Sequence, residues 1–155
     1  MALASAKNQT VLFAERPSRI ELLKLQMDRG TAPLTIRVHR NHSFEHMASV
    51  IPPWFALFGC KAMFNYSNYD DSLNFGFTES AQAQLEIIWL DSKRYEARLD
   101  SLEFADWLAG RVAVLRARTN APILLAVVGL SDEEHTRIVK AVPAMPGVRV
   151  ADIHP

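Results

Sequence analysis

The chain has 155 residues and carries 17 basic and 17 acidic side chains, so its formal net charge is zero. That balance argues against nucleic acid or a membrane surface as partner, because binders of phosphate-rich surfaces cluster Lys and Arg. Cys60 is the only cysteine, which excludes an intrachain disulfide and favours a reducing, cytoplasmic setting. No signal-peptide pattern and no run of ~20 apolar residues is present, so we expect a chain that is neither exported nor embedded in a membrane.

Residues 1–33 are expected to form a lead-in segment with one short helix. Ser18 and Glu21 have the spacing of a capping box, aliphatic residues follow, and Gly30 ends the pattern. Residues 34–155 are expected to form an α/β domain.

The first strand is predicted over residues 34–40, where apolar and polar side chains alternate. Its polar set predicts a face that is wet or covered by something polar; the set is Thr35, Arg37 and His39. A helix is expected to follow with Ser43 as its N-cap, to be interrupted at Pro52 and Pro53, and to end at Gly59.

A second strand is predicted over residues 60–67, followed by a long polar stretch without periodicity up to residue 84. Long loops at strand ends are often functional. Four residues at the end of this strand and the start of the polar stretch could form a lid or a partner-binding rim, the alternative being an ordinary solvated loop: Tyr66, Asn68, Tyr69 and Asp70.

The second half of the chain repeats the alternation of strand and helix. Strands are predicted at 85–90, 122–129 and 146–153. The first intervening helix has Ser101 as its expected cap and a buried stripe of Leu102, Ala105, Leu108, Val112 and Leu115. The second begins with a capping box of Ser131 and Glu134 and buries Ile138 and Val142.

This alternation predicts an α/β fold with a doubly wound, parallel, five-stranded sheet of strand order 2-1-3-4-5. In such sheets the ligand crevice lies at the carboxyl ends of the strands where the order reverses, between the first and third strands. That rule points to the loops at residues 41–43, 65–72 and 91–95, and to Asn41, Tyr69, Asp91 and Arg94 within them. Asp91 and Arg94 could orient a carboxylate or phosphate, or could cap the next turn and pair locally.

Several segments together resemble the N-terminal domain of FkbH-like proteins. These are HRNHSFEHM, YSNYDDSL, IIWLDSKRY and EFADWLAGRVAVLRARTNAPILLA, which span roughly residues 34–130. The resemblance implies an SGNH-hydrolase or flavodoxin-like fold and fusion to a C-terminal phosphatase-like HAD domain. It further implies that the whole protein loads a glyceryl unit onto an acyl carrier protein in polyketide or related biosynthesis.

The HAD domain carries that chemistry in the family. Its D-x-D-x-[TV] motif does not occur in this sequence, so none of its catalytic residues can be placed on this chain. We therefore expect the N-terminal part of a larger protein, with an acyl carrier protein and the HAD domain as partners and no catalytic step of its own. No cofactor is expected, because the turn NHSFEH lacks the Gly-rich character of a phosphate cradle.

An alternative is a stand-alone SGNH-type esterase or acyltransferase. Ser43 lies where such enzymes place their nucleophile, at the turn into the first helix, although Asn41-His42-Ser43 replaces their Gly-Asp-Ser. Asp152 and His154 would complete a triad, with a spacing one residue shorter than theirs.

A metal site is a further hypothesis. HSFEH matches the pattern H-x-x-E-H, which would make His42 and His46 ligands on one helix, with His39 as a third. Trp107, predicted opposite the buried stripe of its helix, is a candidate for a contact with another domain.

Overall fold

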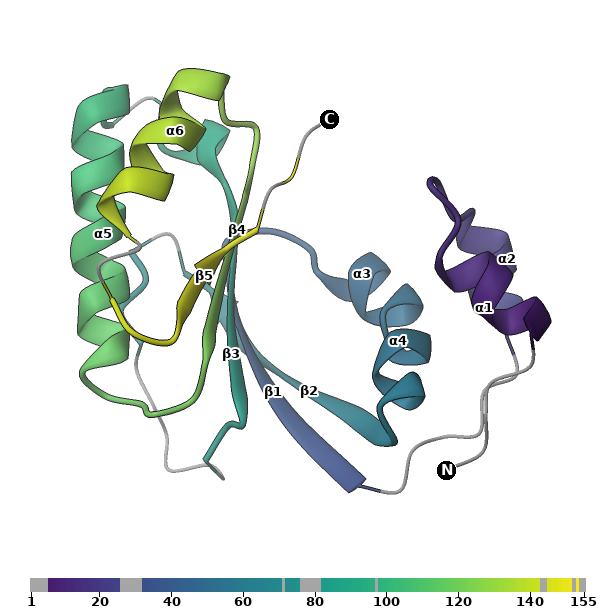
Figure 1. The fold of residues 1–155 in the computed structure, drawn as a ribbon. Coiled ribbons are helices and arrows are strands. Elements are labelled where there is room, and N and C mark those ends of the chain that lie inside the picture. The colour runs from purple at the N-terminus through teal and green to yellow at the C-terminus, as the bar shows by residue number, and fades with distance from the viewer. Residues whose placement is uncertain are drawn as a thin grey trace. The chain divides into compact units, whose positions relative to one another are not determined.

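The computed structural model describes residues 6–25, 32–70, 72–75, 82–96, 98–142, 145–151 and 153. The chain divides into two compact units, one made of Met1–Thr35 and Ser43–Phe64, the other of Ile36–His42 and Asn65–Pro155. In the described part of the chain a five-stranded sheet has the order β2-β1-β3-β4-β5 (Figure 1). The strands are β1 (Ala32–Arg40), β2 (Cys60–Tyr69), β3 (Leu85–Asp91), β4 (Ile123–Val128) and β5 (Val148–Val150).

Parallel pairing joins β1 to β3, β3 to β4 and β4 to β5. The predicted fold class and strand order are therefore confirmed. The apolar runs in β3 and β4 explain the pairing, because strands of parallel sheets bury both of their faces.

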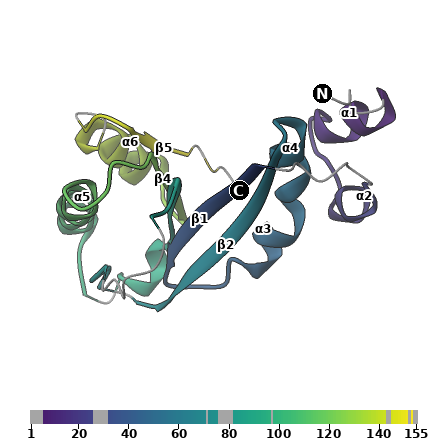
Figure 2. The ribbon, with the colours of Figure 1, turned by 90° about the horizontal axis from the view of Figure 1, so that it is seen from below.

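The core of the second unit lies between the sheet and two helices, α5 (Ser101–Arg116) and α6 (Asp132–Ala141), which pack side by side (Figures 1 and 2). Both helices contribute completely buried side chains, namely Leu108, Val112, Leu115, Ile138 and the flanking Val142. Four residues of the predicted stripe are thus buried, whereas Leu102 is 59% exposed. Trp107 is half-buried and packs against the rings of Tyr95 and Phe104, at 4.9 and 5.9 Å between ring centres.

Capping boxes begin both helices. Ser131 and Glu134 form the predicted box at α6. At α5 the cap is Asp100, which accepts from the backbone N–H groups of Leu102 and Glu103, one residue before the expected Ser101. Asp and Ser are about equally good caps, so propensity alone could not choose between adjacent positions.

Four short helices lie among the described residues of the first unit: α1 (Ala6–Leu12), α2 (Arg19–Lys24), α3 (Glu45–Val50) and α4 (Pro52–Leu57). Two helices therefore occupy the lead-in segment for which one was expected, and Ser18 caps α2 as predicted. Pro52 divides α3 from α4, and Gly59 closes α4 with a φ of +73°. The N-cap of α3 is Phe44 rather than Ser43. Gly30 lies outside the described residues.

The stretch after β2 is anchored rather than free in solvent where it is described. Tyr66, Asn68 and Tyr69 belong to β2 itself. Leu73 and Phe75 are buried in the core, and Arg111 donates to the carbonyl oxygen of Leu73.

Asp70 fixes the turn that follows β2. Its carboxylate accepts hydrogen bonds from the backbone N–H groups of Ser72 and Asn74 and from the Ser72 hydroxyl. Partial burial opposes ionisation of Asp70, but these hydrogen bonds outweigh it and lower its pKa. Among the described helices, none is both long and apolar enough to cross a lipid bilayer.

Candidate functional site

Polar side chains gather where β1 and β3 end. Asn41 and His42 follow β1, Asp91 ends β3, and a single 3-10 turn, η1 (Ser92–Arg94), comes next. Because β1 and β3 are neighbours and the strand order reverses at this point, these groups occupy the position where α/β sheets bind ligands. We call Asn41, His42, Trp89, Asp91 and Arg94 the carboxyl-edge cluster.

Asn41 ties the two strand ends together. Its side chain is completely buried; Nδ2 donates to the Asp91 carbonyl oxygen at 3.1 Å, and Oδ1 accepts from the Asp91 backbone N–H at 2.9 Å. The side-chain amide thereby completes the hydrogen bonding of the Asp91 backbone. Asn41, predicted to contact a ligand, uses its side-chain amide here to hold the ends of β1 and β3 together.

The same amide sets the tautomer of His42. Nδ1 of His42 lies 3.0 Å from Asn41 Oδ1, which is an acceptor, so in neutral His42 the proton is on Nδ1 and Nε2 carries the lone pair. The ring also stacks on Trp89, with 5.1 Å between ring centres. His42 is therefore held on two sides in a defined orientation.

Burial favours the neutral form of His42. Burial lowers the pKa of His42 below its usual 6.5; the Asp91 carboxylate acts in the opposite direction, and the Arg94 guanidinium lowers the pKa further. Protonation thus costs more in the folded chain than in the unfolded one. This contribution to stability is fully present above pH 6.5 and is lost as the pH falls from there through the folded pKa.

We predict opposite effects from the two neighbouring charges. Arg94→Ala should raise the pKa of His42 and Asp91→Asn should lower it, as followed by the ring carbon-bound proton signals in an NMR titration. Arg98→Ala, which removes a charge from an exposed residue of the same β3–α5 connection, serves as the control. A His42 pKa that responds equally to Arg94→Ala and Arg98→Ala would contradict the placement of Arg94.

Asp91 also has a local structural role. Its Oδ1 accepts from the Lys93 backbone N–H at 3.1 Å and so caps η1. Of the two alternatives left open by the sequence, the capping role is present in the structure. Arg94 is exposed, and its charge acts on His42.

The turn after β4 comes close to this connection. Gly129 has a φ of +82°, and a Cβ there would lie 3.1 Å from Ser92 Oγ and 3.4 Å from Asp91 Oδ1. Gly129→Ala should lower the free energy of unfolding by about 1–3 kcal/mol, because alanine is strained at this φ. Gly110→Ala, in the open middle of α5, should raise it by about 0.5–1 kcal/mol. Urea denaturation of both variants measures these changes. If both substitutions shifted the free energy of unfolding in the same direction, the prediction would be wrong.

A second polar group on the sheet was not anticipated. Glu86 on β3 is completely buried; Oε1 lies 3.4 Å from Nη1 of Arg37 and Oε2 lies 3.0 Å from Nε2 of His39. His39 is itself 4% exposed and meets the ring of Phe75 edge to face. The polar face predicted for β1 is therefore covered by a buried carboxylate. The sequence feature that could have indicated this buried carboxylate is the one Glu within a predicted apolar strand.

Ser43 belongs to the other compact unit. Its hydroxyl donates to Glu45 Oε2 at 2.6 Å, and the same oxygen accepts from the Phe44 backbone N–H at 3.0 Å. Asp152 and His154, the other members of the hypothetical triad, lie outside the described residues.

The proposed metal ligands are distributed differently from the H-x-x-E-H geometry. His42 precedes α3, which begins at Glu45, whereas His46 lies within it, so the two histidines do not share a helix. No three His, Cys, Asp or Glu side chains of the described residues are grouped so that they could hold a metal ion.

Tyr69 is 56% exposed on β2. The Arg40 guanidinium lies over its ring at 4.4 Å and over that of Tyr66 at 4.6 Å. Tyr69 therefore presents an aromatic surface beside a cation.

Comparisons with known proteins bear on the fold. No protein-family model matches the chain, and no curated protein matches it significantly. The chain is similar to a crystal structure of the N-terminal part of the protein BF1531 from Bacteroides fragilis, which contains a phosphatase domain and is complexed with Mg. The TM-score is 0.60 at 9% identity, and the match covers 99% of this chain and 46% of that one. The likeness establishes a shared α/β fold, and this chain spans less than half the length of the solved structure.

Proposed function

We propose that this chain is the N-terminal module of an FkbH-like protein and that it binds the phosphopantetheine arm of an acyl carrier protein without supplying a catalytic group. The reaction served would be the loading of a glyceryl unit by a C-terminal HAD domain. The motif resemblance over residues 34–130 and the fold shared with the N-terminal part of a phosphatase-domain protein support this assignment.

The hydrogen bonding of Ser43 supports the part of the proposal that this chain supplies no catalytic group. In the triad of an SGNH-type esterase a histidine takes the proton of the serine nucleophile, whereas the single hydroxyl proton of Ser43 is donated to Glu45. Glu45 in turn also holds the backbone N–H of Phe44 at the start of α3. This arrangement is typical of a local helix-start motif, and the esterase alternative gains no support from it.

The carboxyl-edge cluster supports the part of the proposal that this chain binds the phosphopantetheine arm. Arg94 is an exposed guanidinium, a group that recognises phosphate with two parallel hydrogen bonds. His42 is oriented by Asn41 and Trp89, so its ring is already ordered before a ligand arrives. Asp91 and Tyr69 remain proposed partner contacts of the second unit, and Ser43 remains a separate proposed contact of the first unit.

The test compares two small probes that differ only in the phosphate. On NMR titration of the full chain, 4′-phosphopantetheine should shift the backbone amides of residues 41–42 and 91–94, and pantetheine should shift them much less. Arg94→Ala should weaken the binding of phosphopantetheine about tenfold, and Arg98→Ala should leave it unchanged. Holo carrier protein should then reproduce the same shifts and apo carrier protein should not.

Two outcomes would overturn the proposal. Equal shifts with both probes would remove the role of the phosphate, and no saturable shift at millimolar probe would remove the binding site. Separately, labelling by a fluorophosphonate that disappears in Ser43→Ala would establish a reactive serine and move the assignment to the esterase.

A further inference from the structure

His42 has one ring nitrogen left for a ligand. Nδ1 lies 3.0 Å from Asn41 Oδ1, and no hydrogen-bond partner of Nε2 is found among the described residues. The ring is half-buried and stacked on Trp89, so it is held in one orientation. Nε2 is therefore the atom through which His42 can contact a bound molecule.

The hydrogen bonds of Asn41 determine whether Nε2 donates or accepts. Asn41 Oδ1 accepts from the Asp91 backbone N–H at 2.9 Å, and Nδ2 donates to the Asp91 carbonyl oxygen at 3.1 Å. A reversed amide would set donor against donor and acceptor against acceptor. The atom that faces His42 Nδ1 is therefore an oxygen, and it keeps the proton of neutral His42 on Nδ1. Nε2 then carries a lone pair and accepts a hydrogen bond.

This lone pair does not suit a phosphate oxygen, which is also an acceptor. Burial lowers the pKa of His42, and although Asp91 raises it and Arg94 lowers it further, the net shift favours the neutral ring. The phosphate therefore belongs at the exposed guanidinium of Arg94, which supplies N–H donors. A ligand that contacts both residues needs an O–H or N–H donor for His42 in addition to its phosphate.

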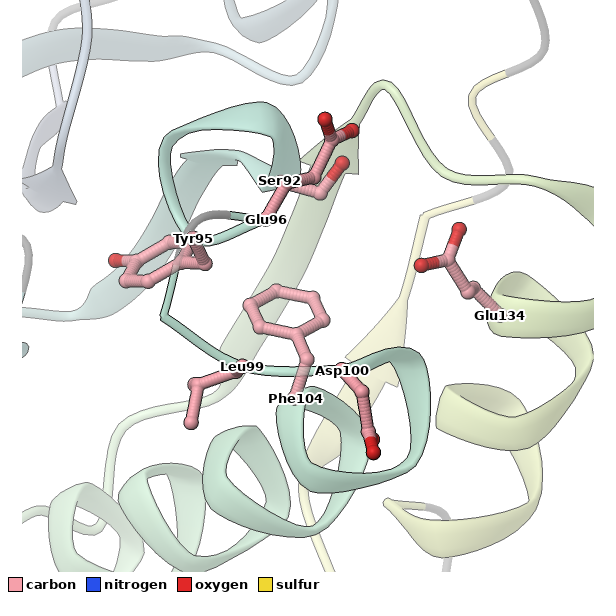
Figure 3. Close-up of a pocket in the computed structure, with 7 residues that line it drawn as sticks. All are labelled: Ser92, Tyr95, Glu96, Leu99, Asp100, Phe104 and Glu134. Atoms are coloured by element: carbon pink, nitrogen blue, oxygen red, sulfur yellow. The ribbon is translucent and has the colours of Figure 1, made fainter.

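The pocket on the other side of η1 does not provide an acceptor for that donor. No residue of the carboxyl-edge cluster lines this pocket (Figure 3). Its acidic groups do not converge, because the Asp100 carboxylate points away from Glu96 and Ser92 (Figure 3). Asp100 instead accepts from the first backbone N–H groups of α5. The acceptors for a ligand held by Arg94 are therefore within the cluster itself.

Two acceptors of the cluster can be compared, His42 Nε2 and the Asp91 carboxylate. Asp91 already uses Oδ1 to cap η1, and its negative charge repels a phosphate brought close to it. Neutral His42 has no such charge, and its fixed ring loses little freedom when a ligand binds. His42 is thus the better acceptor beside a phosphate.

We propose that His42 is a specificity-determining residue of the carboxyl-edge cluster, whose Nε2 accepts a hydrogen bond from a hydroxyl group that the ligand carries close to its phosphate. The inference rests on the function proposed above and adds which part of the ligand His42 recognises. In the phosphopantetheine arm this part is the free hydroxyl of the pantoyl group.

The test compares 4′-phosphopantetheine with its deoxy analogue, in which hydrogen replaces that hydroxyl. On NMR titration of the full chain above pH 6.5, 4′-phosphopantetheine should bind about threefold to tenfold more tightly, the effect of one neutral hydrogen bond. The preference should disappear as the pH falls through the pKa of bound His42, because a protonated Nε2 cannot accept. Both probes carry the same phosphate, so its own titration affects them equally.

Two further measurements identify the acceptor. His42→Phe keeps a ring that can stack on Trp89 but has no acceptor, so it should bind both probes with equal affinity. His46→Phe, at an exposed histidine of α3, should keep the preference. In the unmutated chain, the nitrogen NMR signal of His42 Nε2 should move on binding 4′-phosphopantetheine and much less with the deoxy analogue. This signal tests the contact even if His42→Phe does not fold.

The outcomes separate this inference from the function on which it rests. Equal affinity of the two probes above pH 6.5 would overturn the role of His42 and leave the phosphate site in place. A preference that survives in His42→Phe would assign the hydroxyl to another acceptor, such as Asp91, and would also overturn it. If neither probe gave a saturable shift, the proposed function and this inference would both be wrong.

Discussion

Glu86→Ala is expected to lower the free energy of unfolding by about 3–5 kcal/mol, the cost of removing one partner from a buried charge pair. The carboxylate is completely buried, and both of its oxygens are used, one by Arg37 and one by His39. Arg37 is itself only 15% exposed at its side chain. Without Glu86, a guanidinium and an imidazole lose the acceptor for which they were desolvated.

The measurement is urea denaturation followed by circular dichroism. The free energy of unfolding of a domain of this size is about 5–15 kcal/mol. Glu86→Ala is therefore expected to remove a large part of it. Glu86→Gln keeps the shape and one acceptor and should cost less, about 1–3 kcal/mol. It therefore tests the same contact if the alanine variant does not fold. Glu96→Ala, at an exposed carboxylate, should stay within about 0.5 kcal/mol of the parent chain.

A triple variant separates charge pairing from packing. Replacing the group together, as Arg37→Met, His39→Leu and Glu86→Leu, should recover most of the loss, because an apolar group of similar volume needs no desolvation. A Glu86→Ala chain that loses less than about 1 kcal/mol would show that the contacts of Glu86 with Arg37 and His39 contribute little to folding.

Glu86 also shows where sequence reasoning reached its limit. The apolar neighbours of Glu86 correctly predicted a buried strand, and the alternation in β1 correctly predicted a polar face. Their meeting depends on the register, in which Arg37 faces Glu86 across β1 and β3. Nothing in either segment alone specifies a register between residues 49 positions apart.

The helices illustrate the same difference between local and distant information. The capping box of Ser131 and Glu134 and the helix break at Pro52 were predicted correctly. A helix cap or a helix break depends on a few adjacent residues, so the local sequence is enough to predict it. The helix α1 was missed because its seven residues, AKNQTVL, are mostly polar and have no apolar period. Its burial of Leu12 arises from tertiary packing.

The strand order located the candidate site, but it could not predict the contacts within the site. The switch-point rule selects the ends of β1 and β3 from the order of strands alone, and the loops at these ends contain Asn41, Asp91 and Arg94. It could not predict that the Asn41 side chain holds the Asp91 backbone. The two bonds from the Asn41 amide to the Asp91 backbone, which decide this, exist only once β1 and β3 are adjacent.

Asn41→Ala is accordingly expected to lower the free energy of unfolding by about 2–4 kcal/mol. The substitution leaves the N–H and C=O groups of Asp91 without their side-chain partner at a partly buried position, and an unsatisfied buried group costs about 1–3 kcal/mol. It also removes the acceptor that holds Nδ1 of His42, so the nitrogen NMR signals of that ring should report a mixture of tautomers. Asn120→Ala, at an exposed asparagine, should change neither quantity.

Asn41→Asp tests the same position by charge at nearly constant volume. An aspartate keeps an acceptor for His42 but has no N–H to donate to the Asp91 carbonyl oxygen, and it places a carboxylate at a site with no exposure. The variant should therefore be at least as unstable as Asn41→Ala near pH 7. In the fraction that folds, the new negative charge should raise the pKa of His42, opposite in direction to Asp91→Asn. Stability equal to the parent chain, or a lowered His42 pKa, would mean that Asn41 does not support the cluster as its geometry implies.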